Sequence, residues 1–393
     1  MFPRLKKTCY ICCGKVTTFV CVDATFCSPY AAQWSGDFDT PMYKTLFIIN
    51  PKAGTARKDM VENAIQEHID RTRHEASIEY TTHAGHAAEI AREHAGKADI
   101  IVAVGGDGTV NEVARSLVSA GTALGIIPCG SGNGLARHLR IPMDVAAAVQ
   151  LINEAVTDAL DYGRINGEAF FCTCGVGFDA FISMKFAEAG KRGLATYIEK
   201  TLQDGLSYKP EVYQIELDGE HETYEAFLIA CANASQYGNN AYIAPDASTR
   251  DGLLDVTVLT PFSTFEAPQI VMQLFNRQLA KNSRVKVFRT KHVRITRKNA
   301  GPAHIDGDPV QMGETLDVEL IPRGLRAVVN SHPGHRPLMF PKVQAMGRDI
   351  ESFNHELEET FFRNVIEPFQ KMENLKVNDL RMFKQLIDRF RKP

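Results

Sequence analysis

The stretch that most constrains the fold is residues 99–118, where an apolar run leads directly into a glycine-rich turn and a helix pattern. The run IIVAV (100–104) is apolar at every position, as expected of a strand covered on both faces of a parallel sheet. GGDG (105–108) follows, and apolar residues then recur at i, i+3, i+4, i+7 and i+8 from Val110. A buried strand, a tight turn and an amphipathic helix in this order predict an α/β fold.

The same alternation continues on both sides of this stretch. The strand-like runs KTLFIIN, SIEYTT and ALGIIP alternate with helix patterns such as 56–71 and 85–95. We therefore predict that residues 42–160 form a doubly wound α/β domain. After residue 160, Asn-Gly and Asp-Gly pairs separate short alternating runs, which is typical of β-hairpins. Residues 161–335 are expected to form a mainly antiparallel β domain, with helical stretches around 193–205 and 263–280.

The two ends of the chain are predicted to lie outside these domains. Residues 1–41 carry five of the nine cysteines, of which only Cys9 and Cys12 have a zinc-like spacing. We expect this segment to be a dispensable or spurious extension, with an export or lipid signal and a metal knuckle as alternatives. Residues 336–393 are expected to form a helical tail. Its apolar face would contact one of three surfaces: a membrane, the protein itself, or a second subunit in a homodimer.

Composition and net charge argue against some classes of function. The net charge of −3 and the sequence pI of about 6.5 argue against nucleic-acid binding, which usually requires a basic surface. No stretch approaches the roughly 20 apolar residues that span a bilayer. The cysteines outside the N-terminal segment have apolar or glycine-rich neighbours, as in a reduced cytoplasmic protein. We expect a cytoplasmic protein whose membrane role, if it has one, is peripheral at the inner membrane surface.

Three glycine-rich turns follow predicted strands: NPKAG (50–54), GGDG (105–108) and PCGSGNG (128–134). Backbone N–H groups at a helix N-terminus bind anions, and a missing Cβ lets phosphate oxygens approach. Open α/β sheets bind ligands at this carboxyl edge of the strands. Asp107 would repel a phosphate unless Mg²⁺ or water lies between them, so it either serves such a bridge or caps a helix. The chain has neither GxxxxGK[ST] nor a GxGxxG turn after its first strand.

In order and spacing, these motifs resemble those of the diacylglycerol kinase catalytic-domain family, which includes sphingosine kinases, ceramide kinases and bacterial soluble lipid kinases. The resemblance covers about residues 42–330. It implies an α/β domain and a β-sandwich domain around a cleft in which ATP phosphorylates a lipid hydroxyl. The nucleotide-binding residues that it implies are Asn50, Pro51, Lys52, Ala53, Gly54, Thr82, Gly105, Gly106, Asp107, Gly108, Thr109, Asn111, Glu112, Gly130, Ser131 and Asn133.

Two further motifs support the resemblance. GVGFDAFIS (175–183) is similar to the stretch that bears the family's lipid-contacting aspartate, here Asp179, and the phenylalanines nearby suit an apolar substrate. STRDGLLDV (248–256) resembles a magnesium loop. Its implied ligands are the Asp251 side chain and the carbonyls of Ser248 and Leu253. From the residues alone, this segment is equally a plain turn into a strand.

The last motif, HIDGDP (304–309), resembles the family's DGE motif, whose acidic residue accepts the hydroxyl proton. The resemblance selects Asp308 as this base, with Asp306 as the second catalytic candidate. Asp107 would orient the site from the nucleotide side. Two residues depart from the family pattern: Asp308 stands where Glu is usual, and Gly134 stands where many diacylglycerol kinases carry Asp.

The sequence therefore predicts an ATP- and Mg²⁺-dependent kinase acting on a diacylglycerol- or sphingoid-type lipid at a membrane surface. One alternative is a relative of NAD kinase or phosphofructokinase with a soluble substrate, since those enzymes also use a GGDG turn. The other is a catalytically weak regulator that binds nucleotide or lipid.

Overall fold

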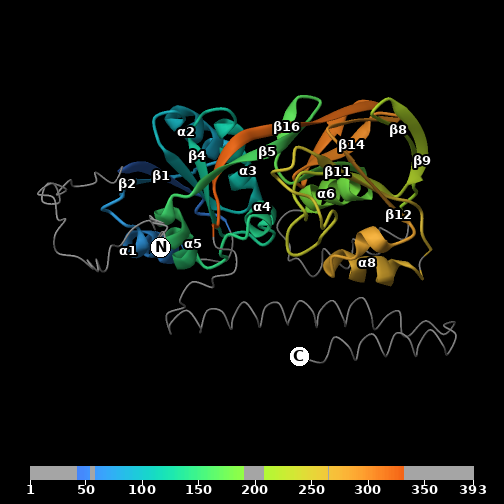
Figure 1. Cartoon of the computed structure of the whole chain (residues 1–393). Coiled ribbons are helices and arrows are strands. Elements are labelled where there is room, and N and C mark those ends of the chain that lie inside the picture. Colours follow the sequence, from blue (N-terminus) through green and yellow to red (C-terminus); the bar gives the residue numbers. More distant parts are fainter. Residues whose placement is uncertain (1–41, 54–57, 190–207, 264, 332–393) are drawn as a thin grey trace, which may run out of the picture. The chain divides into compact units, whose positions relative to one another are not determined.

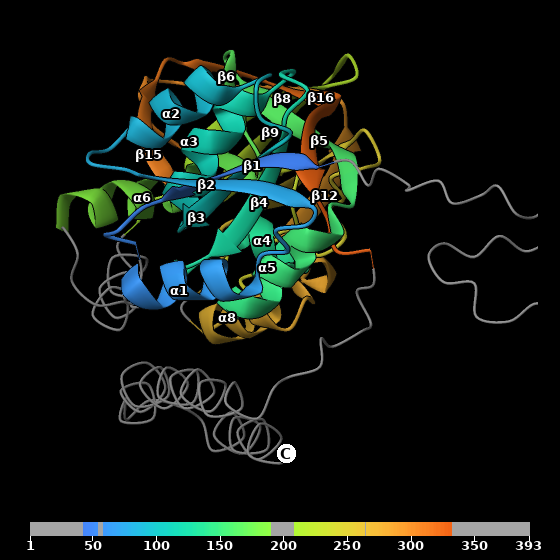
Figure 2. The same ribbon diagram turned by 90° about the vertical axis from the view of Figure 1, so that its left-hand side faces the viewer.

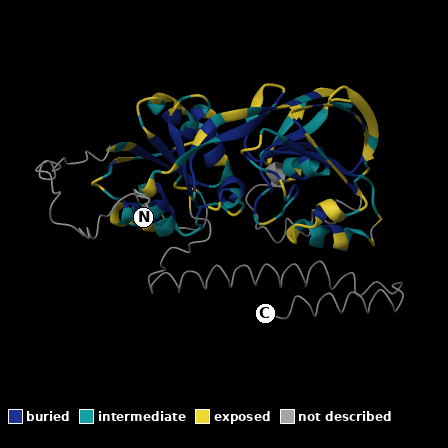
Figure 3. Ribbon diagram, viewed as in Figure 1, coloured by how far each residue is buried: buried dark blue, intermediate teal, exposed yellow. Residues whose placement is uncertain are grey.

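The computed structural model describes residues 42–53, 58–189, 208–263 and 265–331, and its first half is built on a parallel sheet (Figure 1). The four strands are ordered β2-β1-β3-β4. They are β1 (Tyr43–Ile49), β2 (His74–Tyr80), β3 (Ile100–Gly105) and β4 (Ala123–Pro128). Every residue of β3 and β4 is buried (Figure 3), as expected of parallel strands covered on both faces.

Helices cover both faces of this sheet. α1 packs beside α5 on one face, and α2 packs beside α3 on the other (Figures 1 and 2). The helices of this half are α1 (Lys58–His68), α2 (His86–His94), α3 (Asp107–Leu117), α4 (Gly134–His138) and α5 (Val145–Glu154). The apolar stripe predicted from Val110 to Leu117 is the buried face of α3.

The parallel sheet continues without a break into the second half of the chain. The long strand β16 (Thr315–Val328) pairs in parallel with β4 through Ala327 and Leu124, and its other end belongs to the β-rich half. Beyond β4 the order is β16-β13-β8-β9, and β5 pairs with both β16 and β6. These strands are β5 (Thr157–Ile165), β6 (Glu168–Phe170), β8 (Glu211–Leu217), β9 (Glu220–Ala226) and β13 (His292–Arg297).

A second sheet, antiparallel throughout, packs against this extension with the order β12-β11-β10-β7-β14-β15. Its strands are β7 (Thr173–Gly177), β10 (Leu228–Ala232), β11 (Leu254–Leu259), β12 (Val285–Thr290), β14 (Gly301–Ile305) and β15 (Asp308–Met312). The predicted hairpin turns at 166–167 and 218–219 are present, and positive φ angles at both residues of each explain the Asn-Gly and Asp-Gly pairs.

The β-rich half carries the helices α6 (Phe178–Ala189) and α8 (Ala267–Phe275) and a 3₁₀ turn, η2 (Leu279–Lys281). The helix predicted around 263–280 is present as α8 but ends at Phe275, whereas α6 was not predicted. Residues 1–41, the helix predicted at 193–205 and the tail 336–393 lie outside the described residues. Within the described part, no helix is long and apolar enough to cross a membrane. The predicted fold class, an α/β domain followed by an antiparallel β-sandwich domain, is confirmed.

Candidate active site

The glycine-rich turns meet at the carboxyl edge of the parallel sheet. In the strand order β2-β1-β3-β4, the chain leads from β1 to β2 on one side and then back to β3 on the other side of β1. The topological switch point of the sheet therefore lies between β1 and β3, where open α/β sheets form a ligand crevice. Asn50, after β1, bridges this point: its Nδ2 donates to Thr109 Oγ1 on α3 at 3.0 Å, and its Oδ1 accepts the Lys52 N–H at 3.0 Å. Pro51 and Lys52 are exposed, and Gly54 lies outside the described residues.

Glycine allows the turns after β3 and β4 to touch through their backbones. A Cβ added to Gly130 would lie 2.5 Å from the Gly106 Cα, so neither turn could approach the other with a larger residue there. Gly108 faces open space, and neither its N–H nor that of Thr109 is bonded within the described part. The first turn of α3 therefore offers free N–H donors on an open side, which is the geometry that binds phosphate.

Asp107 closes the N-terminus of a neighbouring helix. Its Oδ2 accepts the N–H of Asn133 at 2.8 Å and its Oδ1 accepts the N–H of Gly134 at 2.7 Å, so it caps α4 rather than its own helix. Asn133 has a positive φ of 52° and bonds through its side chain to both backbone groups of Gly130. Both carboxylate oxygens of Asp107 are thus engaged in holding the turn after β4.

Glu112 plays the same part on the other side of α3. Its two oxygens accept the N–H groups of Gly85 at 2.9 Å and Ala87 at 3.1 Å, at the start of α2. Asn111 is buried, and its Oδ1 has no partner within the described part. Carboxylates from α3 therefore close the N-termini of α2 and α4, while the N-terminus of α3 itself stays open, as a phosphate-binding site would require.

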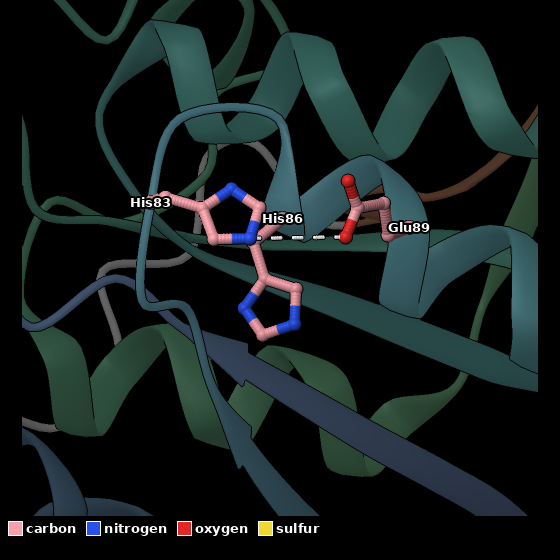
Figure 4. Close-up of side chains that lie close together, drawn as sticks. All are labelled: His83, His86 and Glu89. Atoms are coloured by element: carbon pink, nitrogen blue, oxygen red, sulfur yellow. Dashed lines mark ion pairs between the residues drawn. The ribbon is translucent and has the colours of Figure 1, made fainter.

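Thr82, after β2, is held by a cluster that the sequence did not indicate. The cluster consists of His83, His86 and Glu89 (Figure 4). The Thr82 N–H donates to His86 Nδ1 at 3.1 Å, so in neutral His86 the proton is on Nε2. The His83 ring stacks on that of His86 with centroids 4.8 Å apart, and Nδ1 of His83 donates to the Ala84 carbonyl. Glu89 Oε2 lies 3.9 Å from His83 Nε2. Because His86 Nδ1 is engaged by Thr82, the cluster fixes the Thr82 loop rather than presenting three free metal ligands.

Asp306 anchors the hairpin between β14 and β15. With φ angles of 52° and 89°, Asp306 and Gly307 form its two-residue turn. The Asp306 carboxylate accepts the N–H groups of Phe171, Cys172 and Thr173 at 2.9, 2.7 and 3.0 Å. Burial raises the pKa of this carboxyl, and the three donors oppose that shift. With three donors on its two oxygens, Asp306 holds the hairpin in place.

Asp308, the other acid of this motif, is exposed, and its carboxylate has no hydrogen bond or ion pair within the described residues. Although the residue as a whole is exposed, desolvation by the protein atoms around its carboxylate raises its pKa. The carboxylates of Glu112 and Asp107 raise this pKa further, whereas Arg115 and His304 oppose the shift. Three of these charged groups, Asp107, Glu112 and Arg115, belong to α3. The two halves of the site meet directly at the turn after β4, where the Asn239 N–H donates to the Gly132 carbonyl at 2.9 Å.

Asp179 lies in a buried polar network. Its Oδ2 is 3.0 Å from His304 Nε2 and accepts the Tyr237 hydroxyl at 3.0 Å, while its Oδ1 accepts the N–H of Ala180. Only 9 % of the Asp179 side chain and 1 % of that of His304 are exposed. A Cβ on Gly175 would lie 2.7 Å from Asp179 Oδ2, so glycine is needed there. The network ties α6 to β14, the strand that leads into the Asp306 turn.

Aromatic rings surround this network on one side. Phe178 lies 4.5 Å from Phe227 and 5.5 Å from Tyr208 between ring centroids, and Phe181 stacks against Phe178 at 6.3 Å. The Phe227 ring also meets Phe262 at 4.7 Å. Phe186, the next phenylalanine along the chain, was also expected to line this site, but its side chain is outside the described residues.

The predicted magnesium ligands lie in an acidic group that an arginine partly neutralises. Arg289 pairs with Asp251 through Nη2 and with Asp255 through Nε at 3.4 Å, and Asp251 Oδ1 accepts the Leu253 N–H at 3.1 Å. Asp255 is buried, its Oδ2 has no partner within the described part, and desolvation raises its pKa to about 6. This orphaned oxygen and Asp251 suit a hard cation, which would share Asp251 with Arg289.

Comparison with known proteins identifies the family. Residues 44–165 match the family model of the diacylglycerol kinase catalytic domain, and residues 173–329 match that of the YegS C-terminal NAD kinase beta sandwich-like domain. A protein of Yersinia pestis named probable lipid kinase YegS-like is 30% identical over 295 residues, covering 72% of this chain and 96% of that protein. This chain belongs to the diacylglycerol kinase catalytic-domain family.

Two further proteins are similar to this chain. An uncharacterized protein of Synechocystis sp. is 31% identical over 297 residues, which are 71% of this chain and 68% of that protein. The crystal structure of a diacylglycerol kinase from Bacillus anthracis superposes with a TM-score of 0.58 at 22% identity, over 74% of this chain and 97% of that chain. At this identity, the superposition shows a shared fold.

Proposed function

We propose that this protein is an ATP- and Mg²⁺-dependent kinase that transfers the γ-phosphoryl group to a hydroxyl of a diacylglycerol- or sphingoid-type lipid. Membership of the diacylglycerol kinase family supports phosphoryl transfer. The observation that carries the proposal is Asp308, a carboxylate without a bonded partner in the described structure, held by an anchored hairpin within electrostatic reach of α3. On this proposal the enzyme works in the cytoplasm, peripherally at the inner membrane surface.

The nucleotide side needs positioned donors more than reactive side chains, because phosphoryl transfer relies mainly on positioning and charge neutralisation. The free N–H groups of Gly108 and Thr109 would hold phosphate oxygens, and the turns around Asn50 and Ser131 would flank them. Asp107 would contribute by keeping the turn after β4 in place. It thus acts as a positioning residue, and its carboxylate is not required to meet the nucleotide.

On the acceptor side, Asp308 would take the proton from the lipid hydroxyl. Its raised pKa suits a base, because proton transfer is most effective when the pKa lies nearer the working pH. Asp306 cannot easily serve, because three backbone donors already engage it. Asp179 could bind the lipid head group only if its Oδ2, which already bonds His304 and Tyr237, also accepted a hydrogen bond from the lipid.

Mg²⁺ would be held by Asp251 and the carbonyls of Ser248 and Leu253, with the orphaned oxygen of Asp255 as a further donor. When bound, the ion supplies positive charge against the phosphates. The aromatic rings of Phe178, Phe181 and the side chains around them favour an apolar acceptor over a soluble one. A homodimer stays a prediction.

A transfer assay on the full chain tests the proposal. The protein is incubated with radiolabelled ATP, Mg²⁺ and a total lipid extract in vesicles, and labelled lipids are identified by mass spectrometry. We expect one class of phosphorylated lipid, and its loss in Asp308→Ala. Transfer to NAD or a sugar phosphate but to no lipid would replace the proposal with a soluble-substrate kinase. Nucleotide binding without transfer to any acceptor would favour a regulatory protein.

A further inference from the structure

Helix α8 carries apolar side chains on its outward face as well as on its inward face. Ile270 and Leu274, one turn apart, pack inward against the core beneath the helix. Phe275 at the end of α8 is 46 % exposed, and Phe265 just before it is 76 % exposed. Val287 on β12 shares a strand face with the buried Val285 of this core, and it is 40 % exposed. Two large aromatic rings thus stand in solvent at the two ends of one helix.

The segment that contains α8 and β12 is rich in basic residues, although several of them pair with acids: Arg284 with Glu266, Arg289 with Asp251 and Asp255, and Arg294 with Asp317. Residues 267–305 contain no Asp or Glu, although the whole chain has a net charge of −3. The nine basic residues of this segment are Arg277, Lys281, Arg284, Lys286, Arg289, Lys291, Arg294, Arg297 and Lys298. Arg277, just beyond α8, and Lys281 on η2 are exposed and form no ion pair within the described part. Both follow Phe275 within six residues, and η2 contacts α8, so these two cations lie at the carboxyl end of the helix.

The core beneath α8 is continuous with the aromatic rings of the candidate acceptor site. Ile270 and Leu274 belong to the same cluster as Phe178, Phe227 and Phe262. Phe178 directly precedes Asp179 in α6. Helix α8 lies at the periphery of the β-rich half and covers the core that contains the rings of the proposed lipid site (Figure 1).

We propose that Phe265, Phe275, Val287, Arg277 and Lys281, the α8 patch, dock the protein on the surface of a bilayer that contains anionic lipids. Exposed aromatic rings enter the headgroup boundary, and basic side chains near the surface are attracted by anionic headgroups. The inference rests on the proposed function, because a kinase for bilayer lipids must bring its acceptor site to the membrane. The exposed cations Arg277 and Lys281 favour a bilayer as the occupant, because their like charges oppose a second copy of the same patch.

Vesicle binding tests the patch without any catalytic step. The full chain is sedimented, in the absence of ATP, with vesicles of phosphatidylcholine alone or with phosphatidylglycerol added. We expect Phe265→Ser/Phe275→Ser to weaken binding to the mixed vesicles by roughly tenfold or more. Arg277→Glu/Lys281→Glu should abolish the preference for mixed vesicles. Val212→Ser is the matched control, since Val212 is 57 % exposed on β8, and it should bind as the wild type does.

Activity assays separate this inference from the proposed function. Both patch variants should phosphorylate a short-chain, water-soluble diacylglycerol at the wild-type rate and a long-chain lipid in vesicles more slowly. Wild-type vesicle binding by both variants would refute the patch, whatever the activity shows. Patch-dependent binding without phosphorylation of any lipid would refute the kinase proposal and leave the docking surface standing. A shift from dimer to monomer in the phenylalanine variant, with vesicle binding unchanged, would instead make the patch a subunit interface.

Discussion

Replacing Asp107 tests whether its carboxylate holds the protein together or works on a ligand. Asp107→Ala removes two hydrogen bonds from a charged acceptor, at 2.7 and 2.8 Å, to the N–H groups of Gly134 and Asn133. Hydrogen bonds to charged groups contribute about 1.5–3 kcal/mol each, which gives an upper range of roughly 3–6 kcal/mol. Water can reach this half-buried site and replace part of the loss. We therefore expect the free energy of unfolding to fall by about 2–4 kcal/mol.

Asp107→Asn should lose roughly half as much, because its amide oxygen can keep one bond while its NH₂ group faces the second donor. Urea denaturation gives the free energy of unfolding, and calorimetric titration with a non-hydrolysable ATP analogue gives the affinity. We expect the affinity to fall at least tenfold in Asp107→Ala, because the turn after β4 loses its anchor. Asp144→Ala is the matched control. It removes the cap of α5 at Ala147 and should cost about 1 kcal/mol without changing the affinity.

The capping argument predicts that stability and affinity fall together. If Asp107→Ala unfolds within about 0.5 kcal/mol of the wild type yet has no turnover, the carboxylate acts on nucleotide or metal and the argument is wrong.

Asp308→Ala should lower kcat by roughly 10²-fold, because the lost carboxylate is the proposed base. Its melting temperature should not change, because the carboxylate has no structural partners. Asp308→Glu should keep or raise kcat. Asp306→Ala should instead lower the melting temperature; activity lost only there would reverse the two roles. Gly130→Ala places a Cβ 2.5 Å from Gly106 Cα and should cost about 1–3 kcal/mol in urea denaturation. Burial lowers the pKa of His138 to about 4 in the folded protein, below its ordinary value of 6.5. Between pH 6.5 and 5 it is mainly the unfolded chain that gains a proton, so the free energy of unfolding should fall by about 2 kcal/mol. His138→Gln should flatten this dependence, and an unchanged slope would contradict it.

Sequence patterns predicted the elements whose signals are local. The apolar strands, the stripe on α3 and the Asn-Gly and Asp-Gly hairpins each depend on neighbours within a few residues. Helix α6 was missed because its sequence, FDAFISMKFAEA, is apolar on several sides and lacks a clear amphipathic period. The parallel pairing of β16 with β4 was missed because it joins residues about 200 positions apart.

Within the candidate site, residue types were easier to predict than what each side chain binds. GGDG signalled an anion site, but Asp107 caps a helix 27 residues away, which requires the turns after β3 and β4 to be adjacent. Likewise, DGD offered two acids, of which the family resemblance selected Asp308. The physical difference is not local: backbone donors at 171–173, more than 130 residues away, engage Asp306 and leave Asp308 free of them. His304 gave no signal as a lone histidine, although it is the buried partner of Asp179.

The strand β16 has a consequence for how the chain is made. Its pairing with β4 at Ala327 and Leu124 completes the parallel sheet, so the α/β half lacks its last strand until residue 327 has left the ribosome. Until then, β4 presents an open edge of unpaired N–H and C=O groups, the kind of edge that recruits other chains. Closing pairs so distant in sequence is slow, because the loop entropy is lost before the contacts form. Nascent chains stalled before residue 315 should therefore depend on chaperones, and an isolated 42–160 fragment should aggregate.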